Sequence, residues 1–296
     1  MYEVKRKLRL SPKVAAAVVI LAAGLILWLL SGRSKLNAEE AGQRPPEGES
    51  AQNSLSYEET EQGMQGAKAD PEPVPVTPAR PIDPDKPMVA LTFDDGPNGE
   101  SSRQILDCLE TNGVVATFFE IGCNVKEYPD VAKRAYDLGC EIGSHTFSHK
   151  ALTNMSAEER EQDRQLCKET FESAIGVEPK LIRPPQGSVV HSIMDASDQI
   201  FVGWSVDTED WLYQNVDRTV NKVKQYGDLD GQVILMHSIY KESAEAAEQI
   251  IPWLVEQGYQ LVTVSELFQY HYGITPEQHF YYAYDYFISD GAVKVR

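Results

Sequence analysis

Short apolar runs alternate with segments of helical length between residues 88 and 263. The first run, 88–93 (MVALTF), carries no charge and is followed by turn residues, a pattern typical of a buried strand. The sequence predicts strands at 88–93, 115–121, 140–143, 180–183, 200–205, 232–236 and 260–263. It predicts helices near 101–111, 128–138, 156–175, 189–198, 217–226 and 243–257.

Helix-end signals support this map. Ser156 and Glu159 have the spacing of a capping box at the start of the third helix. Four glycines stand where helices are expected to stop, as glycine commonly does after the last helical turn: Gly113, Gly139, Gly176 and Gly258. Strands and helices in alternation predict an α/β fold with a parallel sheet, and closure into a β/α barrel is the expected architecture.

The N-terminal segment has a different pattern. Residues 14–30 are uncharged and apolar, at the short end of the membrane-spanning range, and the preceding residues 1–13 are basic. Because positive flanks stay in the cytoplasm, we expect a single-pass anchor at 14–30 with the rest of the chain extracellular. A signal peptide is the alternative, with secretion after cleavage, but no small-x-small cleavage site follows the run.

Two further segments flank the strand-helix region. Residues 31–82 are rich in Pro, Glu and Gln and poor in large apolar side chains, which predicts a disordered extracellular linker. Residues 271–296 form an aromatic-rich C-terminal extension that we expect to pack across the barrel surface, with carbohydrate or partner binding as the alternative. The intervening 83–270 is the predicted catalytic domain.

Charge and cysteines narrow the functional classes. The formal net charge of −18 argues against nucleic acid as a partner, since phosphate binding requires a basic face. Four cysteines, none in a C-x-x-C pair, leave buried thiols and disulfides both open.

Polar side chains follow the predicted strands at the points where the strands end. Because the C-terminal strand ends of a β/α barrel form one mouth, we expect these side chains to share a pocket. They are Asp94 and Asp95, His145 and His149, the segment 183–187 (RPPQG), the segment 207–211 (DTEDW) and His237.

One Asp and two His form a three-ligand set suited to a catalytic zinc, and the other Asp is free to act on water. The spacing of His145 and His149 would place both rings on one side of a helical turn. Thr146 stands where a zincin has its Glu, so the base must come from elsewhere. Taken alone, the Asp pair is equally typical of a turn, and spaced His pairs occur by chance.

Three other side chains have expected roles next to that set. Arg183 can orient a carboxylate through a bidentate contact. A protonated His237 can donate a proton to a leaving group, with Asp210 holding it in the charged form, although a buried core histidine is the alternative. Trp211 can form an aromatic wall for a sugar or belong to the core. No role is assigned to the remaining histidines, His191, His271 and His279.

The motifs TFDDGP, SHTFSH, RPPxG, DTxDW and ILMH, in this order, resemble the polysaccharide deacetylases, the NodB homology domain of carbohydrate esterase family 4. The resemblance implies a distorted (β/α)7 barrel, a divalent metal, usually Zn²⁺ with Co²⁺ possible, and removal of acetyl groups from sugars. It implies Asp94 as general base, oriented by Arg183, and His237 as general acid, tuned by Asp210. It implies Asp95, His145 and His149 as metal ligands, Trp211 and Leu235 in the acetyl-methyl pocket, and the Gln186 backbone N–H as an oxyanion donor.

The chain departs from the family pattern at Gln186, where an aromatic residue is usual, and at Ser238, where Asp is frequent. The first departure leaves the backbone donor in place but puts substrate preference in doubt. We expect a monomeric, membrane-anchored enzyme that deacetylates peptidoglycan N-acetylglucosamine. The alternatives are an O-acetyl xylan esterase, a chitooligosaccharide deacetylase and, from another class, an inactive carbohydrate-binding module.

Overall fold

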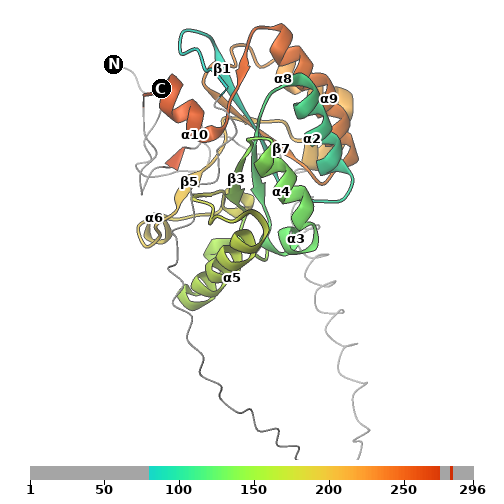
Figure 1. The fold of residues 1–296 in the computed structure, drawn as a ribbon. Helices are drawn as coiled ribbons and strands as arrows, with labels where there is room; N and C mark the ends of the chain where they lie inside the picture. Colours follow the sequence, from blue (N-terminus) through green and yellow to red (C-terminus); the bar gives the residue numbers. More distant parts are fainter. Residues whose placement is uncertain (1–79, 274–280, 283–296) are drawn as a thin grey trace, which may run out of the picture. The chain divides into compact units, whose positions relative to one another are not determined.

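A computed structural model of the chain describes residues 80–273 and 281–282 (Figure 1). The predicted anchor 14–30, nearly all of the predicted linker 31–82 and most of the predicted extension 271–296 lie outside the described residues. Within the described ranges, every helix is too short or too polar to cross a membrane.

The domain is built on one parallel sheet with strand order β6-β7-β1-β2-β3-β4-β5-β9, and β8 pairs with the start of β1. All seven predicted strands are confirmed in place. The strands are β1 (Met88–Asp94), β2 (Thr117–Glu120), β3 (Glu141–Ser144), β4 (Leu181–Ile182), β5 (Ile200–Val202), β6 (Val206–Asp207), β7 (Gln232–His237), β8 (Gln260–Leu261) and β9 (Tyr281–Tyr282).

The sheet is a half-barrel rather than the closed barrel expected from the sequence. Residues 200–205 were predicted as one strand, but β5 ends at Val202 and pairs with β4, whereas β6 pairs with β7 at the other end of the sheet. The three residues between β5 and β6 reach at most roughly 14 Å, so the two ends of the sheet must curl toward each other. Among the described strands, no ladder joins those ends.

Helices cover the outside of the sheet, with α2, α8 and α9 packed together on one side (Figure 1). The six predicted helices are confirmed, α6 as a shorter element, and the short α3, α7 and α10 were not predicted. Their bounds are α2 (Ser101–Asn112), α3 (Gly122–Glu127), α4 (Pro129–Asp137), α5 (Ala157–Ile175), α6 (His191–Met194), α7 (Asp210–Tyr213), α8 (Val216–Lys224), α9 (Lys241–Glu256) and α10 (Val264–Glu266). Single turns occur at η1 (Leu152–Asn154), η2 (Pro185–Gly187) and η3 (Leu267–His271).

Local signals in the sequence have the expected structural roles. Ser156 and Glu159 form the predicted capping box. The four predicted stop glycines all have positive φ, a conformation that glycine adopts without the strain a side chain would bring. All four cysteines are free thiols, and two of them, Cys140 and Cys167, are buried.

Alternation along β1 determines where the functional side chains point. Val89, Leu91 and Phe93 belong to the core cluster beneath the outer helices, whereas Met88 and Ala90 belong to a second cluster on the opposite face of the sheet. Since successive strand residues face opposite sides, Thr92 and Asp94 continue the second set toward the inside of the half-barrel. The apolar run therefore ends with a buried carboxylate on the inner face.

Candidate active site

A cavity of about 430 Å³ opens at the C-terminal ends of the strands, and its size is typical of small-ligand sites. Eight of the ten predicted site residues line it. The other two, Arg183 and Asp210, lie buried behind it and bond to Asp94 and His237. The cavity is lined by Asp94, Asp95, His145, His149, Pro184, Gln186, Trp204, Asp207, Trp211, Leu235, His237 and Tyr240.

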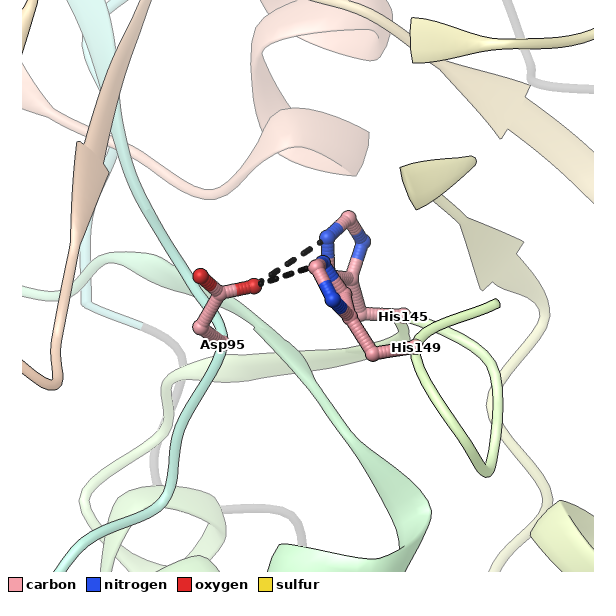
Figure 2. A group of neighbouring side chains, drawn as sticks. All are labelled: Asp95, His145 and His149. Atoms are coloured by element: carbon pink, nitrogen blue, oxygen red, sulfur yellow. Dashed lines mark ion pairs between the residues drawn. The ribbon is translucent and has the colours of Figure 1, made fainter. Parts of the chain in front are cut away.

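Asp95, His145 and His149 bring one ligand atom each to a common point, all within 4.8 Å of one another (Figure 2). The Asp95 Oδ1 atom lies 3.4 Å from Nε2 of His145 and 3.2 Å from Nε2 of His149. Burial raises the pKa of Asp95, but the two imidazoles outweigh burial and lower it well below its usual range. The same contact raises the pKa of His149.

The donor set fits a divalent cation. Nδ1 of His145 lies 2.6 Å from the Arg183 carbonyl oxygen, so this nitrogen carries the proton and Nε2 presents a lone pair. The Asp95 Oδ1 atom is buried and accepts no hydrogen bond from the described residues. A lone pair and a carboxylate oxygen therefore face each other with no proton between them, an arrangement that a cation stabilises.

The histidine pair lies on a loop, so the predicted helical turn is wrong. β3 ends at Ser144, and Thr146 and His149 both have positive φ. The rings nevertheless converge, with centroids 5.0 Å apart. The loop is held by Asp163 of α5, whose carboxylate accepts from the backbone N–H groups of residues 147 and 148 at 2.7 and 3.2 Å. Sequence reasoning missed this residue because an acidic side chain on a polar helix carries no distinguishing pattern.

Asp94 is fixed by Arg183, as predicted, but through one nitrogen rather than a bidentate fork. Nη1 of Arg183 donates to Asp94 Oδ1 at 2.7 Å and to Thr92 Oγ1 at 2.8 Å. Its Nη2 donates to the Gly203 carbonyl at 2.7 Å, and the guanidinium carbon lies 4.1 Å from the centre of the Phe119 ring. Since Arg183 is fully buried, these contacts fix its guanidinium beside Asp94 Oδ1.

His237 and Asp210 form the second predicted pair. The Asp210 carboxylate accepts from the His237 ring Nδ1 at 2.9 Å, from the His237 backbone N–H at 2.8 Å and from Ser243 Oγ at 2.6 Å. Burial lowers the pKa of His237, but the hydrogen bond with Asp210 and its charge outweigh burial and raise the pKa to about 9. The imidazole is therefore a protonated acid at neutral pH.

The outer wall of the cavity carries the remaining predicted residues. Gln186 adopts a positive φ of 61°, and its backbone N–H makes no hydrogen bond to the described residues. Trp211, which is 47% exposed, and Leu235, which is buried in β7, both line the cavity. Sequence reasoning assigned no role to Tyr240, which lines the same cavity three residues after His237.

Glu120 is a further residue that the sequence analysis missed. It is 1% exposed at the end of β2, and its Oε2 atom has no hydrogen-bond partner among the described residues. Burial, and then the neighbouring Asp94 and Asp95, raise the pKa of Glu120 well above its usual range. The feature of the sequence that could have identified Glu120 is its place at the end of an apolar strand.

The matching family model, described as polysaccharide deacetylase, covers residues 82–200. The peptidoglycan-N-acetylmuramic acid deacetylase PdaC of Bacillus subtilis is 41% identical over 186 residues, which are 63% of this chain and 40% of PdaC. A solved structure of PdaC superposes with a TM-score of 0.62 at 40% identity, covering 64% of this chain and 93% of that structure. The chain thus spans about two fifths of PdaC.

Two other relatives extend the comparison. A peptidoglycan-N-acetylglucosamine deacetylase of Bacillus cereus is 35% identical over 62% of this chain and 89% of its own length. A family 4 acetyl xylan esterase from Clostridium thermocellum, solved with a cobalt ion, has a TM-score of 0.58 at 33% identity, covering 62% of this chain and 90% of that structure. The fold, the converging motifs and these matches lead to one conclusion: the chain belongs to the polysaccharide deacetylase family.

Proposed function

We propose that this protein is a metal-dependent deacetylase that removes the acetyl group from N-acetylglucosamine in peptidoglycan. The observation that carries the proposal is the meeting, in one cavity, of a cation-binding set and two separate proton-transfer pairs. Amide hydrolysis requires a base for the attacking water and an acid for the leaving nitrogen, and the two pairs provide these groups.

In this proposal Asp94 is the base and His237 the acid. Arg183 keeps Asp94 aimed at the cavity, so the carboxylate takes a proton from the attacking water. His237, protonated because of Asp210, gives a proton to the sugar nitrogen as acetate leaves. The free Gln186 N–H donates to the oxyanion that develops on the acetyl group, a contribution that is typically worth about 3–4 kcal/mol.

Asp95, His145 and His149 would hold the metal, and we propose Zn²⁺ because two imidazoles and one carboxylate are ligands it prefers. A divalent cation supplies Lewis acidity, which polarises a carbonyl and acidifies water. The family 4 acetyl xylan esterase was solved with cobalt, so other divalent metals are a second expectation for this site.

The relatives point to two candidate sugars in peptidoglycan: PdaC is named for N-acetylmuramic acid and the Bacillus cereus protein for N-acetylglucosamine. N-acetylmuramic acid carries a lactyl carboxylate, whereas N-acetylglucosamine is neutral. Among the described residues that line the cavity, Asp94, Asp95 and Asp207 are acidic and none is Lys or Arg. The proposed divalent cation and the protonated His237 offset these carboxylates, so charge alone does not discriminate between the two sugars. We propose N-acetylglucosamine because the Bacillus cereus relative, 89% of whose length is matched, is named for that sugar.

Acetylated xylan is the second candidate substrate, because an acetyl xylan esterase is among the similar structures.

The predicted anchor at 14–30 and linker at 31–82 support a cell-surface polymer as substrate: a tethered domain on the outside of the membrane reaches the cell wall. We therefore propose a single-pass membrane location with the catalytic domain outside.

The test is acetate release by the full chain, supplied with zinc, from N-acetylglucosamine oligomers, from peptidoglycan and from acetylated xylan. The proposal predicts release from the first two and loss of release in the Asp94→Asn variant. Activity on xylan alone would establish the esterase instead. Binding to glycans without release from any of them would establish an inactive carbohydrate-binding module.

A further inference from the structure

Tyr240 stands at the cavity next to the proposed acid but has no part in the proton transfers. It follows β7 by three residues and precedes α9, and its side chain is half-buried against the cavity. Its ring centroid lies 6.1 Å from that of His237, and the two ring planes are inclined at 57°. A second aromatic side chain, Trp211, lines the same cavity.

The Tyr240 hydroxyl is available to a ligand. It makes no hydrogen bond to any described residue, and the half-buried side chain lines the cavity. Burial, and then the charges of Asp95 and Asp210, raise the pKa of Tyr240 above its usual range. The phenol therefore stays protonated and can donate a hydrogen bond inside the cavity.

The backbone that carries Tyr240 is held on several sides. The Ser238 N–H donates to the Asp94 carbonyl at 2.9 Å, and Asn98 Nδ2 donates to the Ile239 carbonyl at 3.1 Å. The Tyr240 carbonyl accepts from the Ala244 N–H at the start of α9. Contacts that pre-organise a binding side chain reduce the entropy lost when a ligand binds.

A pyranose has apolar C–H faces and hydroxyl groups around its edge, so a protein binds it with an aromatic ring and hydrogen-bonding groups. We propose that Tyr240 is a sugar-binding residue that packs its ring against the sugar to be deacetylated and donates its hydroxyl to that sugar. The inference rests on the proposed function and adds a substrate-binding residue to it. Tyr240 positions the sugar and takes no part in the chemistry, because the protonated His237 already supplies the acid.

The experiment compares two substrates in the zinc-loaded full chain. One is an N-acetylglucosamine tetramer, and the other is 4-nitrophenyl acetate, which has an acetyl group but no sugar. Tyr240→Ala should raise KM for the tetramer roughly tenfold, because it removes one hydrogen bond and the packing of the ring. The kcat should stay within about twofold of the parent value. Hydrolysis of 4-nitrophenyl acetate should fall far less than hydrolysis of the tetramer, because this substrate has no sugar for the Tyr240 hydroxyl to bind. Tyr240→Phe keeps the ring and should raise KM about threefold.

Tyr270→Ala is the matched control, because Tyr270 is 41% exposed and does not line the cavity. It should leave both substrates unaffected. An equal loss on both substrates for Tyr240→Ala would overturn the inference, as would an unchanged KM for the tetramer, and either leaves the proposed function standing. A parent chain that hydrolyses 4-nitrophenyl acetate but not the tetramer would overturn the proposed function, and the inference with it.

Discussion

The cavity has two sides that differ in how deeply the protein buries them. The inner cluster, which consists of Asp94, Asp95, His145, Arg183 and Asp210, is largely buried, and each member contacts at least one other charged or polar group of the site. The outer wall, which consists of Gln186, Trp211 and Tyr240, is exposed or half-buried. Rigid positioning serves proton transfer and metal binding, whereas an open wall serves recognition of a polymer.

The largest expected effect comes from changing the base of the inner cluster. Asp94→Asn keeps the side-chain volume but removes the group that accepts the proton, so kcat for deacetylation should fall about 10³-fold. Metal content should remain that of the parent, because Asp94 is outside the ligand set. Acetate release and metal analysis check the two parts separately. A variant that retains a tenth of the parent activity would contradict the role of Asp94.

Replacing the buried Arg183 should destabilise the inner cluster. Arg183→Met leaves Asp94 buried without its partner, and breaking a buried pair in this way typically costs about 3–5 kcal/mol. We expect a lower melting temperature together with lost activity. Lys222→Met is the control, since Lys222 pairs with Glu209 at the surface and its loss should cost less than about 1 kcal/mol. Equal melting temperatures for the two variants would refute this account of Arg183.

The pH profile tests the pair of His237 and Asp210. His237 must be protonated to donate, so kcat/KM should fall as the pH rises through its pKa, which Asp210 raises to about 9. Asp210→Asn removes the negative charge, lowers the pKa of His237 and should move the alkaline limb to lower pH. Ser243→Ala removes only a donor to Asp210 and should move the limb less. An alkaline limb that stays in place in Asp210→Asn would rule out His237 as the titrating acid.

The outer wall should give the smallest effects, mainly in KM. Trp211→Ala removes a half-exposed ring and should raise KM for the tetramer roughly fivefold. Gln186→Asn keeps the backbone N–H and tolerates the positive φ, so its kcat should stay within about twofold of the parent value. A large drop in kcat for Gln186→Asn would mean that the Gln186 side chain takes part in the chemistry.

The inner cluster was predictable from the sequence, because its residues directly follow apolar runs whose C-terminal ends must meet. The parallel sheet and the six predicted helices followed from the same alternation, whereas the strand order is seen only in the structure. The exact sheet closure was not predictable: the predicted strand 200–205 covers β5 and the residues after it, and only the tertiary structure shows that β6 follows and pairs with β7.

The residues that support the site could not be predicted from the sequence either. Asp163 and Tyr240 carry no motif, and only the fold brings them to the histidine loop and the cavity. The spacing of His145 and His149 suggested a helix, but positive φ at Thr146 and His149 brings the rings together on a loop instead.

The most direct test of the central claim is the stoichiometry of metal binding. The full chain, stripped with a chelator, loaded with a small excess of Zn²⁺ and dialysed against metal-free buffer, should retain a single ion per chain, and Asp94→Asn should bind as the parent does. His145→Ala and Asp95→Asn should each lose that ion while remaining folded by circular dichroism. A parent that binds no divalent cation, or ligand variants that bind one as tightly as the parent, would contradict the account.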